Sequence, residues 1–324
     1  MKLFFVWIGY LNSIGYGLND AVWINIDESP IPYHVSGKKG LRLHPLSKKD
    51  DHEMRDRTSL AQIRSRCTLI ASIASDNTLQ QHLPQVLMPN ERGLKKKWQL
   101  ASESATEYPC IQVLKGTQGW INTKSFKKYL HILHNIVKAK AAGKKIVLMM
   151  DCLASHISVE ILRVIRKFKW RLMLIPSKLT YMLQPLDAYV FARLKHRLHH
   201  DHSYTRINIS DGHPGFLDWA KTSMSTINSM FETLEAQLFF QKCGCSIPKS
   251  VLSEPIWRFV QHANMGHHRK LTKDELSFFM GRASAMQWHL VFRDPIPENF
   301  RDRPIVIRSP THRLSSKRSF QSLL

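Results

Sequence analysis

Long apolar runs are missing from the 324-residue sequence: none reaches the roughly 18 residues that a membrane-spanning helix needs. Acidic residues are scarce, because 25 Asp and Glu stand against 47 Lys and Arg, which gives a formal net charge of +22. This excess favours a polyanionic partner, nucleic acid first and an anionic membrane surface second. The sequence also lacks the phosphate-loop motif of nucleotide-driven motors and the Gly-x-Ser-x-Gly elbow of serine hydrolases, so neither class is supported.

Cysteine is too sparse for a disulfide scaffold, with 5 residues scattered along the chain. Cys243 and Cys245 are separated by one residue rather than the two of a typical zinc knuckle arm, and no second pair follows. We expect reduced thiols in a cytosolic or nuclear protein. The apolar segment Leu3 to Leu11 resembles a short signal peptide, but no clear cleavage site follows. We interpret it as a buried segment and keep a signal peptide as the alternative.

The order of apolar patterns predicts an α/β fold. Short apolar runs bounded by charged or turn residues predict strands at 22–26, 31–36, 68–74, 85–88, 146–151 and 171–175. Apolar residues at steps of three and four predict helices over 123–142, 157–168, from Leu186 onward, and over 216–234, 256–263 and 272–284. Strand, helix, strand and helix in succession after residue 120 imply a parallel βαβ unit beside earlier antiparallel strands.

Composition divides the chain into four predicted parts. Residues 1–20 form an N-terminal segment, and 21–205 form the α/β domain, with a basic insertion at about 37–66. Residues 206–292 are expected to be a helical region. The last part, 293–324, is rich in Arg, Pro and Ser, and we expect a mobile basic tail.

Three aspartates stand where predicted strands stop or the next helix begins: Asp27, Asp151 and Asp187. Carboxylates at strand ends face the crevice where α/β folds bind ligands. Three of them in one place repel each other unless cations lie between them, and oxygen ligands favour Mg²⁺ or Mn²⁺. Two such ions, roughly 3.5–4 Å apart, can promote cleavage of a phosphodiester. The alternative is a basic structural protein in which each aspartate only caps a turn or helix.

Two segments carry a family resemblance. Residues 147–156 read Val-Leu-Met-Met-Asp-Cys-Leu-Ala-Ser-His, and residues 183–187 read Leu-Gln-Pro-Leu-Asp, with 35 residues between Asp151 and Asp187. With the weaker motif Asn-Ile-Asp-Glu-Ser at 25–29, they resemble the DDE superfamily endonuclease domain of mariner/pogo-type transposases. This branch includes Tigger, jerky and centromere-protein-B-like proteins. The resemblance covers roughly residues 20 to 235.

The resemblance implies an RNase H-like fold and a metal-binding triad of Asp27, Asp151 and Asp187. Asp27 and Asp151 would bridge two Mg²⁺ or Mn²⁺ ions, and Asp187 would complete one coordination sphere. His156 would cap the following helix or touch a phosphate, with a purely structural role as the alternative. The implied function is DNA phosphodiester cleavage or strand transfer. DNA is the expected partner, with no membrane; a homodimer is left open, and the expected compartment is the nucleus, with the cytoplasm as the alternative.

The sequence departs from the family pattern in places. Cys152 replaces the usual Asn, Ala154 the usual Pro, and Ala188 a frequent Gln. These changes weaken the residues that orient the metal ligands. About 20 residues precede the first predicted strand, too few for the family's helix-turn-helix module. We therefore expect the catalytic half of a transposase, with a degenerate or domesticated DNA-binding protein without catalytic activity as the alternative.

Basic residues and one aromatic residue are candidate nucleic-acid contacts. Phosphates attract Lys and Arg, and an aromatic ring can stack on a base. Ordinary solvated surface is the alternative interpretation of each charged run. The candidates are Lys38, Lys39, Lys95, Lys96, Lys97, Trp98, His156, Arg193 and Arg197.

Overall fold

The computed structural model describes residues 1–32, 66–89, 95–115, 119–176, 178–205, 213–245, 251–262, 268–281 and 284–295. Met1–Asp294 forms one compact unit. Most of the predicted basic insertion at 37–66 and of the predicted tail at 293–324 lies outside the described residues.

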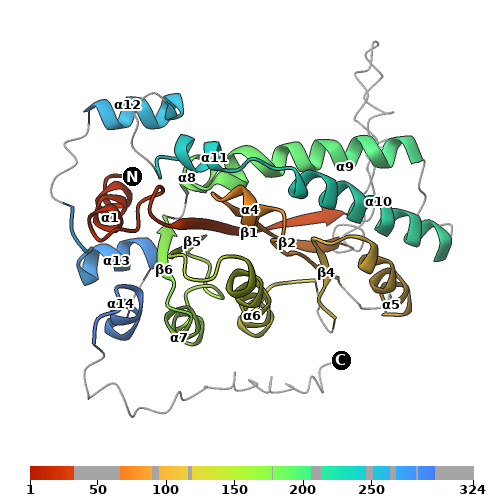
Figure 1. The fold of residues 1–324 in the computed structure, drawn as a ribbon, viewed down its shortest axis with the longest axis horizontal. Coiled ribbons are helices and arrows are strands. Elements are labelled where there is room, and N and C mark those ends of the chain that lie inside the picture. The colour runs from red at the N-terminus through yellow and green to blue at the C-terminus, as the bar shows by residue number, and fades with distance from the viewer. Residues whose placement is uncertain are drawn as a thin grey trace, which may run out of the picture. The chain divides into compact units, whose positions relative to one another are not determined.

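A mixed sheet of six strands is the centre of the fold, in the order β4-β3-β2-β1-β5-β6 (Figure 1). The pairs β1–β2 and β2–β3 are antiparallel, whereas β3–β4, β1–β5 and β5–β6 are parallel. The predicted mixed α/β sheet, antiparallel in its first three strands and then parallel, is therefore confirmed, and it is consistent with an RNase H-like fold. The strands are β1 (Val22–Pro32), β2 (Arg66–Ala74), β3 (Gln85–Met88), β4 (Ile111–Val113), β5 (Ile146–Asp151) and β6 (Arg171–Ile175).

The first strand is longer than the sequence pattern predicts. The predicted break between a strand at 22–26 and a separate strand beginning at residue 31 is wrong, because β1 continues through Pro32 and pairs with β2 along that length. Residues 33–36 of the predicted second strand lie outside the described residues. Its pairing with β5 runs only from Val22 to Asn25. Beyond Asn25 the edge of β1 toward β5 has no ladder partner in the described part of the chain, so a proline there removes no sheet hydrogen bond.

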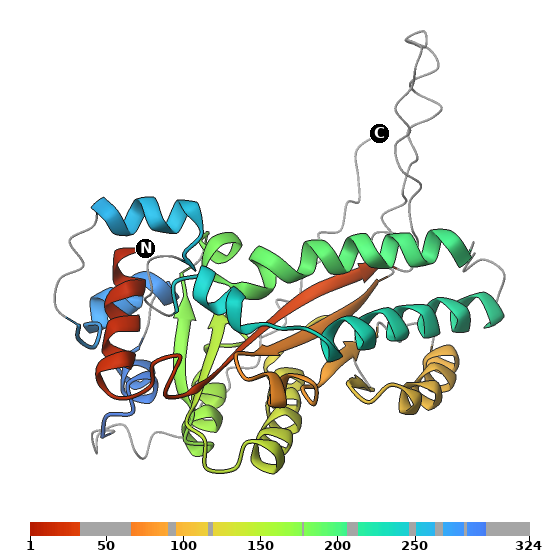
Figure 2. The same ribbon diagram turned by 45° about the horizontal axis from the view of Figure 1, so that its top comes forward.

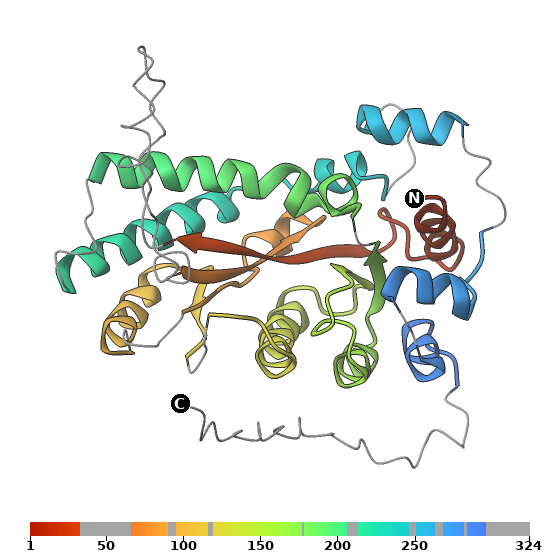
Figure 3. The same cartoon turned by 180° about the vertical axis from the view of Figure 1, so that it is seen from behind.

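Helices cover both faces of the sheet. On one face, α6 and α7 lie side by side (Figure 3). On the other, α9 and α10 run next to each other (Figure 2). We call these the α6 face and the α9 face. The helices that flank the sheet are α4 (Asn77–Gln80), α5 (Lys95–Ser104), η1 (Ala105–Glu107), α6 (Thr123–Lys140), α7 (Val159–Lys167), α8 (Thr180–Leu183), η2 (Leu186–Val190), α9 (Phe191–Thr205), α10 (His213–Glu232) and α11 (Gln237–Lys242).

Helix α6 follows its predicted span closely. Asn122 is its N-cap and forms a reciprocal capping box with Ser125. Gly143, with φ of 78°, lies in the turn after the helix, where a side chain would be strained. The buried face of α6 carries Phe126, whose position at the sheet matters for the site below.

The N-terminal segment is a buried helix. Phe4, Trp7 and Leu11 of α1 (Lys2–Ser13) are almost fully buried, as expected for a segment of the fold. In the described ranges no helix is both long and apolar enough to cross a membrane. The C-terminal helices of the unit are α12 (Glu254–His262), α13 (Lys273–Met280) and α14 (Ala285–Val291). Thr272 forms a capping box with Glu275 at the start of α13.

Candidate active site

The sheet brings the first two predicted aspartates to neighbouring strands. Asp27 lies in β1, and Asp151 is the last residue of β5. The parallel pairing of these strands ends at Asn25 and Met149, and each aspartate follows two residues later in its own strand. Because residues two apart in a strand point to the same face of the sheet, the side chains of Asn25 and Asp27 both lie on the α9 face.

The third aspartate is in an uncommon turn. Asp187 lies in the first turn of η2, a five-residue π-helix between α8 and α9. The wider turn is closed by the amide of Phe191, which donates to the carbonyl of Leu186, five residues earlier. π turns are rare and are often found at functional sites. Asp187 is half-buried, and η2 packs against β1 and β2.

One buried side chain connects all three segments. Asn25 is fully buried, and its Nδ2 donates to the carbonyl of Met149 in β5 at 3.1 Å. Its Oδ1 accepts from the amide of Leu186, at the start of η2, at 3.0 Å. The Asn25 amide group therefore fixes the segments that carry Asp27, Asp151 and Asp187 relative to each other.

The surroundings of Asp27 disfavour the charged form of its carboxyl group. Asp27 is 8% exposed, and its Oδ1 accepts a hydrogen bond from the backbone amide of Glu28 at 2.8 Å. Burial raises the pKa of Asp27 well above its usual value, and the negative charges of Asp187, Glu28 and Asp151 raise it further. No ion pair to Asp27 is found within the described residues. The site therefore has a deficit of positive charge at Asp27.

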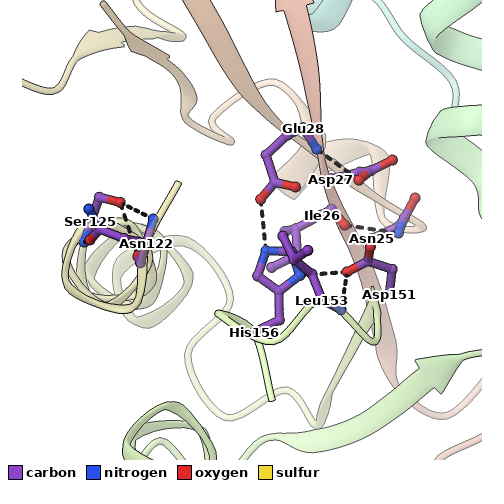
Figure 4. A network of polar contacts seen from close by, with 9 residues as sticks. All are labelled: Asn25, Ile26, Asp27, Glu28, Asn122, Ser125, Asp151, Leu153 and His156. Carbon is purple, nitrogen blue, oxygen red and sulfur yellow. Dashed lines mark hydrogen bonds and ion pairs between the residues drawn. The ribbon is translucent and has the colours of Figure 1, made fainter. Parts of the chain in front are cut away.

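Asp151 belongs to a hydrogen-bonded chain that also contains His156 and Glu28 (Figure 4). His156 Nδ1 is 2.6 Å from Asp151 Oδ1, and its Nε2 is 2.8 Å from Glu28 Oε1. Burial alone lowers the pKa of His156, but the two carboxylates outweigh this effect and raise it to about 10. Burial likewise raises the pKa of Asp151, yet the bond and charge of His156 leave it lowered. His156 is thus an imidazolium that donates from both nitrogens.

The donor set fits a divalent cation in its chemistry. Asp27, Asp151 and Asp187 offer only carboxylate oxygens, the ligands that Mg²⁺ and Mn²⁺ prefer. A cation would also supply the positive charge that Asp27 lacks. In the arrangement described, however, no group of three Asp, Glu, His or Cys side chains encloses a metal site. The carboxylates are near enough to raise the pKa of Asp27 but are not set as a closed coordination shell.

Two predicted nucleic-acid contacts are corrected by burial. Trp98 is 2% exposed and packs edge-on against Phe216 and Trp219, so its ring is part of the core and is not available to a base. His156 is fully buried, which excludes direct contact with a phosphate in this structure. It does not cap α7 either, since the N-cap is Ser158.

The charged candidates on α5 are placed at the surface. Lys95 and Lys96 are exposed. Lys97 is half-buried, with its ammonium 5.7 Å from the centre of the Phe216 ring. Lys38 and Lys39 lie outside the described residues. The role of each in binding remains a prediction.

Helix α9 exposes the other two candidates. The guanidinium of Arg193 lies 5.4 Å from the centre of the Phe239 ring, and Arg197 Nε is 3.9 Å from Asp201 Oδ2. Both side chains remain exposed. Their role in binding is likewise still a prediction.

Sequence reasoning missed two residues that organise the site. In the sequence, Asn25 and Glu28 stand out only as parts of the motif around Asp27. A polar side chain inside an apolar strand is a usable signal, because burying an amide without partners is costly. The partners themselves, Leu186 and His156, are more than 120 residues away and could not be read from the sequence.

The replaced residue after Asp151 has a structural contact of its own. The Cys152 thiol donates to the carbonyl of Ile175 at 3.3 Å, which joins the end of β5 to the end of β6. Burial and the charge of Asp151 raise the pKa of Cys152 to about 12. The thiol is therefore a neutral donor at this position rather than a metal-binding thiolate.

Comparison with protein families agrees with this geometry. The model of the DDE superfamily endonuclease family matches residues 66–230, which include Asp151 and Asp187 but not Asp27. No curated protein matches the chain. Asp27 joins Asp151 and Asp187 through its place on the strand next to β5 and its electrostatic coupling to both of these aspartates. The chain belongs to the DDE superfamily endonuclease family.

Proposed function

We propose that this chain is a transposase-like nuclease domain that cleaves or transfers DNA phosphodiester bonds with two divalent metal ions. The observation that carries the proposal is the buried carboxylate of Asp27, which lies on the strand next to that of Asp151 and is electrostatically coupled to both Asp187 and Asp151. Folding places repelling anions together although this costs stability, as expected where a bound cation is needed for function.

Asp27, Asp151 and Asp187 would hold the ions, either Mg²⁺ or Mn²⁺. The metal would supply activation of a water or 3′-hydroxyl and stabilisation of the leaving oxygen. The protein's part is positioning: Asn25 fixes the three segments, and His156 holds Oδ1 of Asp151. No covalent intermediate with the protein is involved in the proposed reaction.

DNA is the proposed substrate because of the charge of the chain. A net charge of +22 favours a polyanion, and exposed basic residues lie on α5 and α9. We place the chain in the mariner/pogo branch on the motifs around Asp151 and Asp187, and propose the nucleus as its compartment. The family match itself names neither a branch of the superfamily nor a compartment.

A second candidate function is DNA binding without catalysis. It is favoured by the lack of a closed coordination shell among the described side chains and by Cys152 and Ala154, which replace the usual residues of the motif. Such a protein would keep the fold and the basic surface while the carboxylates no longer bind metal.

The test is nicking of supercoiled plasmid in Mg²⁺ or Mn²⁺, with DNA binding measured in parallel by gel shift. Asp187→Asn is the best variant, because Asp187 is half-buried and its replacement keeps the side-chain shape. Asp20→Asn is the matched control, since Asp20 is exposed and precedes the opposite end of β1. We expect at least a ~100-fold loss of nicking for Asp187→Asn alone. Wild-type protein that binds DNA but never nicks it would favour the second candidate.

A further inference from the structure

The adjacent acidic residues Asp27 and Glu28 have different surroundings. Strand alternation sends them to opposite faces of β1, and Figure 4 shows Glu28 directed toward His156 and Asp27 directed away. The ring of His156 packs on Phe126 of α6, with 4.2 Å between ring centres, so Glu28 lies on the α6 face. Only Asp27 is on the face that carries η2. Glu28 is therefore not part of the proposed ligand set.

The contacts of Asp151 select one of its oxygens. Oδ1 accepts from His156 Nδ1 at 2.6 Å and from the amide of Leu153 at 3.1 Å. The Asp151 side chain is 27% exposed, and no hydrogen bond to Oδ2 is found among the described residues. With Oδ1 occupied twice, the rotation of the carboxylate is fixed and Oδ2 remains for a ligand.

His156 can fix the orientation of the Asp151 carboxylate because its own backbone, ring and second nitrogen each have a defined contact. Its backbone amide donates to the carbonyl of Leu153 at 2.8 Å in the turn after β5. Its ring is fully buried against Phe126. Its second nitrogen is fixed by Glu28, which comes from a different strand and is 15% exposed at the side chain. Removing Glu28 would leave a buried ring nitrogen without its acceptor.

We propose that Glu28 and His156 are positioning residues for the metal site. Through the chain Glu28–His156–Asp151, they fix the carboxylate of Asp151 so that Oδ2 is presented to the cation. Neither residue touches the metal or the substrate. The inference rests on the proposed function, because it assigns these residues to the same carboxylate site. This role explains why an acidic residue, Glu28, directly follows Asp27 although its side chain lies on the opposite face of β1.

Mn²⁺ affinity, measured by titration calorimetry on the full chain, tests the proposal without a cleavage assay. Glu28→Ala removes the acceptor of His156, and we expect Mn²⁺ affinity to fall by about 10–100-fold. Glu28→Gln keeps an oxygen that can accept from Nε2, and we expect it to restore most of the affinity. The control is Glu160→Gln, which removes an exposed carboxylate paired with Lys127 at 2.6 Å and should change nothing.

The two Glu28 variants separate positioning from a pure effect of charge. Unchanged affinity in folded Glu28→Ala would overturn the proposal. Equal losses in Glu28→Ala and Glu28→Gln would also overturn it, because the effect would then come from charge alone. If Glu28→Ala does not fold, Glu28→Asp replaces it: a shorter side chain draws the acceptor away, and retained affinity would refute the role. Wild-type protein that binds no Mn²⁺ would instead refute the metal site of the proposed function and remove the basis of the inference.

Discussion

Replacing Asn25 by alanine should destabilise the protein far more than the loss of one small side chain suggests. The side chain is fully buried, and its amide satisfies the carbonyl of Met149 and the amide of Leu186. Asn25→Ala leaves both backbone groups unpaired in the core. Each buried unsatisfied group costs about 1–3 kcal/mol, so we expect a loss of about 2–6 kcal/mol in the free energy of unfolding.

Urea unfolding followed by tryptophan fluorescence gives this free energy. The matched control is Asn19→Ala, because Asn19 is exposed just before β1 and its loss should stay within ~0.5 kcal/mol. Hydrogen exchange adds a local measurement: the Leu186 amide should be protected in the wild type and exchange faster in Asn25→Ala. Equal stabilities for the two variants, or an unchanged Leu186 amide, would show that Asn25 does not hold these segments together.

Two further predictions concern burial. Asp27→Asn should raise the Tm of metal-free protein by about 2–4 °C for each kcal/mol of repulsion removed. The pKa of Asp27 is raised in the folded state, so ionisation of this carboxyl group costs stability as pH rises through its folded-state pKa. The gain in Tm from Asp27→Asn should therefore be larger at pH 8 than near pH 3.8, the ordinary pKa of an aspartate. Thermal scans in EDTA that show no gain in Tm at pH 8 would contradict this. Trp98→Ala should cost about 3–5 kcal/mol in urea unfolding but leave DNA affinity, measured by gel shift, unchanged; weaker binding by still-folded protein would restore Trp98 as a contact.

The strands that are buried on both faces could be predicted from the sequence. β5 and β6 are continuous apolar runs between charged residues or proline, and such runs have few other interpretations. The pattern failed where the signal is weak. Helix α5 begins with three lysines and buries only Trp98 and Ala101, and β4 has three residues, so neither stands out between residues 79 and 120.

The candidate active site could be predicted from the sequence only in part, because the sequence does not show which side chains are buried. Asp151 could be found because it ends an apolar strand that is visible in the sequence, whereas Asp27 lies inside β1 and not, as the sequence pattern had predicted, at its end. Burial of individual side chains was not visible: Trp98 in a lysine-rich segment and His156 beside a motif both resemble surface groups. Their surroundings come from α10, β1 and α6, which contact them only after the chain has folded.

The π turn at Leu186–Val190 makes the site sensitive to chain length. A π turn holds one residue more than an α turn, so deleting a single residue such as Ala188 would let the segment close as ordinary α-helix. Helix α9 is anchored by buried Leu194 and Leu198 and would keep its place. Asp187 would then be rotated by about 100° around the helix axis, away from Asp27. A one-codon deletion would therefore displace Asp187 from the other two aspartates without the loss of any carboxylate.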